Sequence, residues 1–379
     1  MKYKLEELFE LQMGKTPSRN NLEYWNTCEN KWISIGDLSK CGKYISETKE
    51  YISNVAVKES SIKIIPAGTV IMSFKLSIGK TAITNEDIYS NEAIMAFIDK
   101  KVVDMLPEYI YYLFKYKDWD VGTNKAVMGK TLNKATLSQI EVDICSLDEQ
   151  KEIVKRMDMV SDLLKQTKRQ LKNLDELIKS RFVEMFGDIT TANYKYETRK
   201  LGEVANVGSS HRVFTTEFVE EGIPFYRGTE IGELANGISP TEPYYISKEH
   251  YNRLANDDTK PQIGDLLMPS ICNKGQVWMV DTYEPFYYKD GRVLCISPNR
   301  EMFDTKYLEY FMREKTLVEY PKLGSGSTFA EFKIFLLKDI DVLIPPIELQ
   351  NQFADFVKHT DKLKVELLTK NPKERMQIV

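Results

Sequence analysis

The sequence predicts an α+β fold in which two duplicated mixed α/β globular domains are separated by long coiled-coil helices. Three observations predict it: an internal repeat whose copies lie about 200 residues apart, short strand-like runs divided by turn residues, and a long heptad-patterned helix. A chain of 379 residues is long enough for two such domains.

The repeat is clearest at the end of each copy, where "IEVDICSLDEQ" from Ile140 matches "IDVLIPPIELQ" from Ile340. Three further pairs precede it in the same order: "LEELFEL" with "LGEVANV", "GTVIMSFKLSIGK" with "GDLLMPSICNKGQ", and "LPEYIYYLFK" with "DTKYLEYFMR". Chance similarity would scramble this order, so we interpret the chain as a duplication. Gly79 falls on Gly275 in the alignment, which predicts a turn that requires glycine.

Two Gly-Lys-Thr triplets, which begin at Gly79 and Gly129, resemble the end of a phosphate-binding loop. That loop needs another glycine five positions earlier, where this chain has Phe74 and Asn124. The second copy keeps both glycines and loses both lysines. We therefore expect turns with variable tips, as in two readers of two different targets, and no nucleotide site.

Both copies contain the same order of elements. Short strands are expected at "WISIG", "TVIMSF" and "EAIMAFI" in the first copy and at "PFYRG", "DLLMP" and "VLCIS" in the second. A short aromatic helix follows, at "PEYIYYLFKY" or "TKYLEYFMRE", and a long helix ends each copy. The expected organisation is a first globular domain over residues 1–146, a spacer helix over 147–187, a second globular domain over 196–346 and a second, shorter helix over 347–379.

The first long helix should begin after Ser146, place two acidic residues in its first turn, and end near Phe186 before Gly187. Its apolar residues alternate steps of four and three, which favours a coiled coil over a long amphipathic surface helix, the alternative. This stripe consists of Ile153, Met157, Val160, Leu164, Leu171, Leu174 and Ile178. The second helix should extend from about Glu348 to Lys370, because Pro372 should end it.

Composition narrows the class of protein. Lys and Arg total 52 against 56 Asp and Glu, a net charge of −4, which counts mildly against nucleic-acid binding but allows a local basic face. Five scattered cysteines indicate reduced thiols in a cytoplasmic protein, and three distant histidines make a zinc site unexpected. Apolar runs stay below the roughly 18 residues of a membrane span.

The chain has two globular parts, and a long helix follows each of them after an Ile-acid-Val and acid-x-Gln junction. This arrangement resembles the specificity subunit of a type I restriction–modification system. The resemblance covers essentially the whole chain, and "PPIELQ" from Pro345 and "GKTPS" from Gly14 support it. It implies two target recognition domains on antiparallel spacer helices and a bipartite target in double-stranded DNA. It also implies docking of two methyltransferase subunits and, for cleavage, two restriction/translocase subunits. Cys145-Ser146 replaces a frequent Pro-Pro, and the second helix is short.

The resemblance implies a non-catalytic subunit that binds no cofactor. Its partners would use S-adenosylmethionine, and ATP with Mg where a nuclease subunit exists. The residues agree, because the single Pro-Pro, at Pro345, lacks the polar and aromatic neighbours that an amino-methyltransferase needs. "LGSGST" from Leu323 also favours a flexible loop over a cofactor loop. A stand-alone DNA methyltransferase and a coiled-coil scaffold without a DNA role are the alternatives.

DNA reading requires hydrogen-bond donors at loop tips and cations for phosphates. In the first copy the candidates are Lys15, Thr16, Ser18, Arg19, Lys75, Ser77, Lys80 and Lys130. In the second copy they are Ser210, His211, Arg212, Arg227, Asn273, Lys274, Gln276, Ser325 and Ser327. Arg212, Arg227 and Gln276 are favoured for base contacts because bidentate donors discriminate bases, and the lysines for phosphates. A solvated surface residue is the alternative for each.

Overall fold

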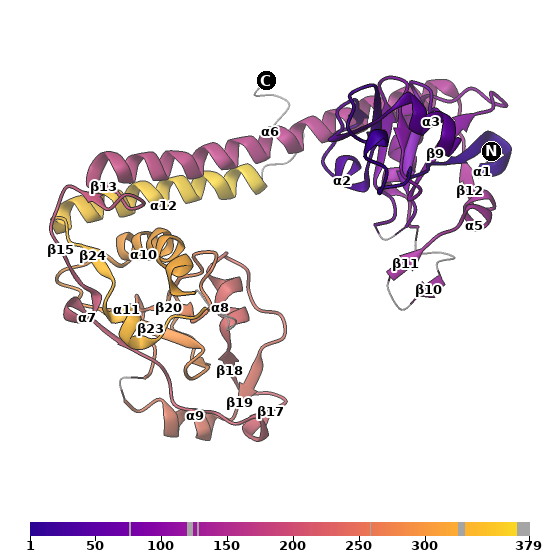
Figure 1. Cartoon of the computed structure of the whole chain (residues 1–379). Coiled ribbons are helices and arrows are strands. Elements are labelled where there is room, and N and C mark those ends of the chain that lie inside the picture. Colours follow the sequence, from indigo (N-terminus) through magenta and orange to yellow (C-terminus); the bar gives the residue numbers. More distant parts are fainter. Residues whose placement is uncertain (76, 120–123, 127–128, 258, 325–329, 370–379) are drawn as a thin grey trace. The chain divides into compact units, whose positions relative to one another are not determined.

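The computed structural model describes residues 1–75, 77–119, 124–126, 129–257, 259–324 and 330–369 (Figure 1). These residues form two compact units, Met1–Lys165 and Gln166–Val379, so the division falls inside a long helix. Both units mix strands and helices, as the sequence predicts.

The first unit is built on a five-stranded sheet of order β2-β9-β6-β7-β4, in which only the β4–β7 pair is parallel. The strands are β2 (Phe9–Met13), β9 (Ile94–Asp99), β6 (Val70–Ser73), β7 (Thr81–Thr84) and β4 (Tyr44–Ile45). The aromatic helix α4 (Pro107–Tyr116) packs against this sheet through Phe114, whose ring lies 4.7 Å from Phe97 and 6.1 Å from Phe9. The predicted strands at "TVIMSF" and "EAIMAFI" and the aromatic helix are therefore confirmed, whereas of "WISIG" only Trp32 and Ile33 are in a strand and Ser34 caps a helix.

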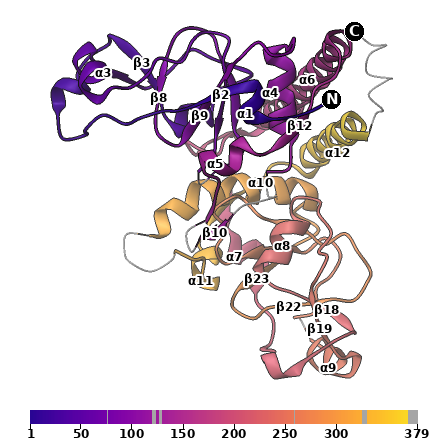
Figure 2. The same cartoon turned by 90° about the vertical axis from the view of Figure 1, so that its right-hand side faces the viewer.

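A smaller sheet lies beside the first (Figure 2). Its order is β5-β3-β8, and β3 is parallel to β8. Its elements are η1 (Leu22–Tyr24), β3 (Asn30–Ile33), α2 (Ile35–Leu38), β5 (Glu50–Ile52), α3 (Asn54–Ser60) and β8 (Tyr89–Ser90). Trp32, Ile52 and Ala56 form its own small core, so this sheet is a separate packing layer.

The remaining elements of the first unit join the beginning of the domain to its end. The pair β1 (Lys2–Lys4) and β12 (Glu141–Asp143) is antiparallel, as is the hairpin of β10 (Asn124–Ala126) and β11 (Gly129–Thr131). The short helices α1 (Leu5–Leu8) and α5 (Lys134–Ser138) lie against each other. The β1–β12 pair therefore brings the start of the domain to the junction with the long helix.

The second unit repeats this architecture. Its sheet β16-β23-β20-β21 has the order of β2-β9-β6-β7, and β19-β18-β22 has the order of β5-β3-β8, with β17 added beside β19. The sheet strands are β16 (Ala205–Gly208), β17 (Phe218–Val219), β18 (Ile223–Tyr226), β19 (Tyr244–Ile246), β20 (Leu266–Pro269), β21 (Trp278–Met279), β22 (Tyr287–Tyr288) and β23 (Val293–Pro298). The duplication found in the sequence is thus a duplication of the fold.

Helices and terminal strands of the second unit also follow the first. The pair β15 (Thr198–Lys200) and β24 (Asp341–Leu343) corresponds to β1–β12, and β13 (Gly187–Asp188) and β14 (Asn193–Tyr194) precede it. The helices are α7 (Leu201–Val204), η2 (Thr215–Glu217), α8 (Gly228–Leu234), α9 (Lys248–Leu254), α10 (Thr305–Glu319), η3 (Tyr320–Leu323) and α11 (Ile334–Lys338). The aromatic helix α10 is longer than the "TKYLEYFMRE" segment that predicted it.

The repeated glutamine of the acid-x-Gln junction has a structural explanation. Gln150 and Gln350 are both fully buried, and each amide ties the start of a long helix to the backbone just before an aromatic helix. Each side-chain oxygen accepts one backbone N–H, and each side-chain nitrogen donates to two carbonyl oxygens. The partners of Gln150 are Leu106 N–H at 2.9 Å and the carbonyls of Asp104 and Cys145 at 3.0 Å; those of Gln350 are Asp304 N–H at 3.0 Å and the carbonyls of Met302 and Pro345 at 2.9 and 2.8 Å.

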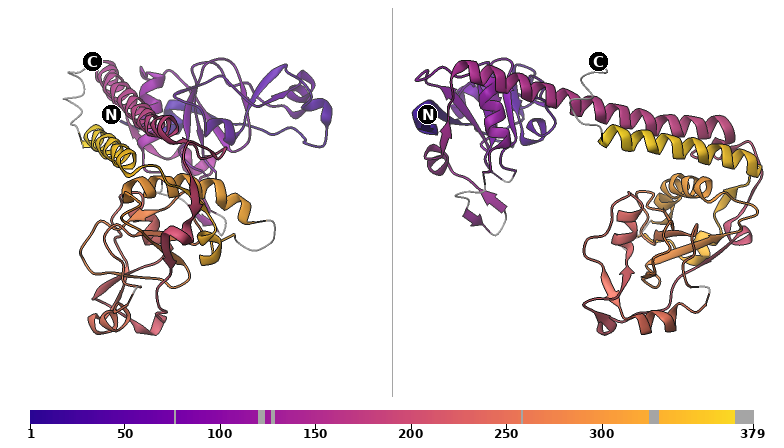
Figure 3. Two further views of the ribbon diagram at one scale, coloured as in Figure 1. Left: turned by 90° about the vertical axis from the view of Figure 1, so that its left-hand side faces the viewer. Right: turned by 180° about the vertical axis from the view of Figure 1, so that it is seen from behind.

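The two long helices are α6 (Leu147–Phe186) and α12 (Ile347–Thr369), which confirms the predicted first helix. Within the second unit they lie side by side and antiparallel (Figures 1 and 3). The end of α6 meets the start of α12, because the rings of Phe182 and Phe186 lie 5.3 and 5.6 Å from Phe353. Further along, Lys364 forms an ion pair with Asp175 at 2.7 Å.

The predicted heptad stripe of α6 is buried in only part of its length. Ile178 is buried in one core with Phe353 and Val357 of α12, and Leu171 and Leu174 are half-buried. In the first half of the helix, Met157 is half-buried against the first unit. The other stripe residues there are exposed: Ile153 at 38%, Val160 at 48% and Leu164 at 54%.

The reason for the exposed stripe is that the first half of α6 turns a different face to its own unit. Val154 packs on the core of that unit, and Asp158 accepts hydrogen bonds from Lys43 at 2.5 Å and from the Tyr112 hydroxyl. The sequence predicts a continuous apolar seam from Ile153 to Ile178. The structure corrects this prediction, because the seam is buried in only part of its length.

Candidate nucleic-acid interface

The strand order brings two predicted loops of each unit to one edge of the main sheet. Strands β2 and β6 are both antiparallel to β9, so they run in the same direction and end at the same edge. The loop after β2 carries Lys15 to Arg19, and the turn after β6 carries Lys75 to Lys80. In the second unit, β16 and β20 stand in the same relation to β23.

The first Gly-Lys-Thr triplet closes the hairpin between β6 and β7. Gly79 has φ of +88° and its counterpart Gly275 has φ of +65°, so both turns use a conformation that disfavours a side chain. A Cβ atom on Gly275 would also lie 2.8 Å from the carbonyl oxygen of Arg313. The triplet leads into a strand and not into a helix N-terminus, and the side chain of Lys80 donates to Ser39 at 2.6 Å. The predicted glycine turn is confirmed.

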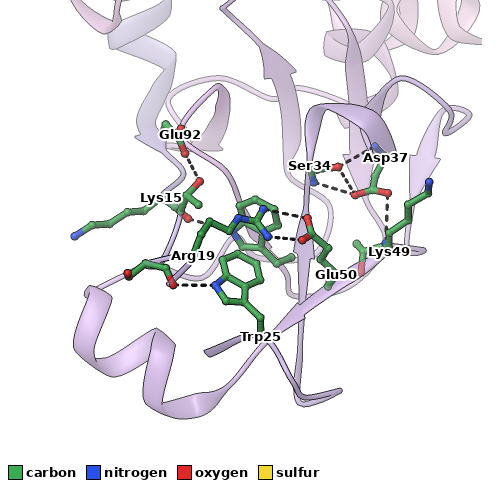
Figure 4. Close-up of polar contacts among 12 residues, drawn as sticks. Lys15, Arg19, Trp25, Ser34, Asp37, Lys49, Glu50 and Glu92 are labelled. Carbon is green, nitrogen blue, oxygen red and sulfur yellow. Dashed lines mark hydrogen bonds and ion pairs between the residues drawn. The ribbon is translucent and has the colours of Figure 1, made fainter. Parts of the chain in front are cut away.

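The loop after β2 is fixed by hydrogen bonds to its backbone carbonyls (Figure 4). The carbonyl of Lys15 accepts the indole N–H of Trp32 at 3.1 Å, and the carbonyl of Ser18 accepts that of Trp25 at 3.0 Å. The Thr16 hydroxyl donates to a carboxylate, so its own donor is engaged. Lys15 and Ser18 are exposed candidates on a rigid loop.

Arg19 is held on two sides. Its guanidinium lies 3.7 Å from the Trp25 ring centroid and 5.0 Å from that of Trp32, and both terminal nitrogens bind the Glu50 carboxylate, with Nη2–Oε2 at 3.1 Å. The side chain nevertheless remains 50% exposed. Cation–π stacking and a bidentate carboxylate together fix the plane of the guanidinium.

The corresponding loop of the second unit carries Ser210, His211 and Arg212. The Ser210 hydroxyl donates to a backbone carbonyl at 2.5 Å, and the ring Nε2 of His211 lies 2.7 Å from Asp257. The hydrogen bond from His211 lowers the pKa of the Asp257 carboxyl to about 2. Arg212 is 67% exposed and contacts Asp290 through Nε at 3.2 Å.

Arg227 is the N-cap of α8 and is anchored more firmly. Its Nε and Nη2 bind the Glu230 carboxylate at 3.2 and 2.6 Å, and its guanidinium lies 4.4 Å from the Tyr244 ring centroid. Glu230 is buried, and its contacts with Arg227 lower its pKa although burial opposes that shift. The Arg227 side chain is 42% exposed.

The turn after β20 carries the remaining described candidates of the second unit. Asn273 and Lys274 are exposed, and the side-chain oxygen of Gln276 accepts the Lys274 backbone N–H at 3.0 Å. That bond occupies the acceptor of Gln276 and leaves its amide nitrogen as the group that could face a base. In the first unit Lys75 and Ser77 are half-buried, and the Lys75 ammonium lies 5.3 Å from the Phe74 ring centroid.

Three candidates lie outside the described residues. Ser325 and Ser327 belong to an undescribed stretch, and the Lys130 side chain is also undescribed, although its backbone is in β11.

Sequence reasoning missed the partners that orient the arginines. Trp25, Glu50 and Tyr244 lie far along the chain from the arginines or gave no pattern that would single them out, whereas Glu230 stands three residues after Arg227, a spacing typical of a capping box. It also missed Arg292, a 62% exposed cation that pairs with Glu331. The capping spacing was the one local signal available.

Within the ranges that the structure describes, no group of three or more His, Cys, Asp or Glu side chains could hold a metal ion. Among the same residues, no helix is both long and apolar enough to cross a membrane.

Two duplicated mixed α/β domains joined by a long helix define a class of recognition protein, and comparison with known proteins agrees. The family described as "Type I restriction modification DNA specificity domain" matches residues 1–174 and 193–374. The chain belongs to this family and contains two copies of its domain. It is a non-catalytic specificity subunit of a type I restriction–modification system, a class that recognises DNA and assembles with other subunits.

Individual relatives cover most of the chain. The MjaIX specificity subunit of Methanocaldococcus jannaschii is 26% identical and matches 94% of this chain and 85% of its own length. The MjaVIII specificity subunit of the same organism is 23% identical over 90% of this chain and 80% of its own length.

Solved structures share the fold. The specificity subunit of a type I system from M. genitalium matches 97% of this chain and 90% of its own, with a TM-score of 0.53 at 14% identity. A chain from a study of complex assembly and conformational transition of the type I R-M system matches 97% of this chain and 91% of its own, with a TM-score of 0.56 at 17% identity.

Proposed function

We propose that the two units read the two halves of a bipartite DNA target, one half-site each. The observation that carries this proposal is a repeated fold with different side chains at equivalent loops. Lys15 and Arg19 follow β2 in the first unit, whereas His211 and Arg212 follow β16 in the second. A shared frame with different donors at its sheet edge is what two readers of unlike sequences require.

The proposal extends to the partners. The chain docks two methyltransferase subunits, which use S-adenosylmethionine, and, where a nuclease subunit exists, two restriction/translocase subunits, which use ATP with Mg. The chain itself supplies target selection and binds none of these cofactors. The assembly acts in the cytoplasm.

The test is methylation-site sequencing in cells that carry the chain with its methyltransferase. Arg212→Ala should relax one half-site only, because a lost bidentate base contact costs about 1–3 kcal/mol of discrimination and the other unit is unchanged. Arg199→Ala is a matched control, since Arg199 also pairs with a carboxylate, at 2.9 Å, but lies on β15 at the junction side of the domain. Equal change of both half-sites by Arg212→Ala would contradict the assignment of one half-site to each unit.

The two alternative functions have their own readouts. Micromolar binding of S-adenosylmethionine to the isolated chain in calorimetry would indicate a stand-alone methyltransferase. A scaffold without a DNA role would show no salt-dependent binding to any duplex, whereas phosphate contacts make DNA affinity fall steeply with salt.

A further inference from the structure

The same position of the fold carries a fixed arginine in both units, but the two arginines come from different places in the sequence. In the first unit the cross-strand pair Trp32–Glu50 joins β3 to β5, and in the second the equivalent pair Phe225–Tyr244 joins β18 to β19. Arg19 reaches the first pair from the loop after β2. Its counterpart in the second unit reaches Tyr244 from the start of α8.

The two units differ at the residue that directly follows strand β3 or β18. Ser34 is the helix cap after β3, and it satisfies Asp37 with its own hydroxyl at 2.7 Å and backbone N–H at 3.0 Å (Figure 4). The equivalent cap after β18 is Arg227, which satisfies Glu230 with its backbone N–H at 2.7 Å and its guanidinium. The first unit has no arginine at this cap, and Arg19 occupies the neighbouring surface instead.

Both arginines are prepared in the same physical way. Each lies on an aromatic ring, Trp25 or Tyr244, and each is bound by two nitrogens to one carboxylate. In the second unit the ring is itself stacked on Phe218, with centroids 4.6 Å apart. Such a guanidinium loses little conformational freedom when it binds a planar ligand.

Each carboxylate binds only one donor edge of its guanidinium. Arg19 binds Glu50 through Nη1 and Nη2, so the edge of Nε and Nη2 remains outside that pair. Arg227 binds Glu230 through Nε and Nη2, so the edge of Nη1 and Nη2 lies outside that pair, and the Tyr244 side chain is a further hydrogen-bond partner of this guanidinium. A guanidinium has five N–H donors, and a two-donor edge matches the O6 and N7 acceptors that guanine presents in the major groove.

We propose that Arg19 in the first unit and Arg227 in the second are the guanine-reading residues of their half-sites. Glu50 and Glu230 are the positioning residues that aim them. This inference rests on the proposed function, since it assumes one half-site for each unit. Beyond the proposed function, it names the base that is read and the two nitrogen atoms of each arginine that read it. It also assigns the reading residue to the same place in the fold of both units.

The test uses alanine variants and charge-conserving lysine variants in cells that carry the chain with its methyltransferase. Arg19→Lys and Arg19→Ala should each remove the requirement for one guanine in one half-site, and Arg227→Lys and Arg227→Ala should do so in the other. Lysine keeps the charge and loses the planar two-donor edge. Arg156→Lys and Arg199→Lys are matched controls, because both arginines pair with carboxylates at 2.8–2.9 Å without an aromatic stack among the described contacts.

A binding measurement on the purified complex of the chain with its methyltransferase separates base contact from loss of fold. Replacing the assigned guanine by 7-deazaguanine removes the N7 acceptor and should weaken wild-type binding. Loss of a whole bidentate pair weakens binding about 5- to 150-fold, and this is the upper limit for loss of one of its two hydrogen bonds. The Arg19→Ala complex should lose little or nothing further from the same replacement, while still responding to changes in the other half-site.

Three results would overturn the inference and leave the proposed function intact. They are a half-site without guanine, an alanine variant with the wild-type target, and equal sensitivity of wild type and alanine variant to 7-deazaguanine. Absence of any bipartite methylated target with the wild-type chain would instead contradict the proposed function.

Discussion

At the scale of single residues, the two junction glutamines show how one side chain can hold a domain to its helix. Gln350 is fully buried and satisfies three backbone groups, one before α10, one in the preceding loop and one at the start of α12. A buried backbone group without a partner costs about 1–3 kcal/mol, so this position depends on hydrogen bonding and not on apolar contact.

Gln350→Leu should therefore lower the free energy of unfolding by about 2–5 kcal/mol, because it conserves volume but abandons those three groups. Chemical denaturation of the full chain measures it. Gln352→Leu, on the exposed face of the same helix, should change stability by less than about 0.5 kcal/mol. Equal effects of the two substitutions would show that the buried hydrogen bonds are not what stabilises the junction.

At the scale of elements, the pairing of α6 with α12 is held by aromatic side chains at one end. Phe353 of α12 is fully buried among Phe182, Phe186, Tyr307 and Tyr310, with ring centroids 5.1–6.3 Å apart. The helix pair and the aromatic helix α10 thus share one core with the second unit.

Phe353→Ala should destabilise the second unit by about 3–5 kcal/mol, the usual cost of removing a buried aromatic ring. Leu368→Ala on the same helix is the control, since Leu368 is 64% exposed and should contribute less than about 0.5 kcal/mol. Circular dichroism during denaturant unfolding follows the helices directly. A loss at Phe353 no larger than that at Leu368 would mean that the helix pair is stabilised elsewhere.

At the scale of the whole molecule, a single helix begins in the first unit and ends in the second. We propose that its length sets the gap between the half-sites. Seven residues added between Leu164 and Lys165 preserve the heptad pattern and lengthen the helix by about 10 Å. DNA rises about 3.4 Å per base pair, so the favoured gap should grow by roughly three base pairs.

Methylation-site sequencing measures that gap, and the half-site sequences should stay the same. Affinity is expected to fall, because three base pairs rotate one half-site by about a quarter turn or more of a helix of about 10–10.5 base pairs. A flexible Gly-Ser insertion of equal length is the matched control and should broaden the gap instead of shifting it. An active complex that kept the original gap after the helical insertion would exclude this helix as the ruler.

Local patterns in the sequence by themselves determined the duplication, the strands, the aromatic helices and both ends of α6. Apolar periodicity, turn glycines at positive φ and a helix-ending Gly187 act over a few residues, so the chain displays them directly. The candidate loops followed from the same patterns, because a loop tip is defined by the strands on either side of it. The repeat strengthened each of these inferences, because a residue pattern found in both copies indicates that both adopt the same backbone conformation.

Only the tertiary structure decided which side chains meet across the fold. The heptad stripe was visible in the sequence, but burial of Ile178 and exposure of Leu164 depend on which neighbour packs on each part of the helix. Arg19 and Glu50 are 31 residues apart, and their contact arises because the loop after β2 lies against β5. Local sequence fixes backbone conformation, whereas the orientation of a charged side chain depends on partners that only folding brings within hydrogen-bond distance.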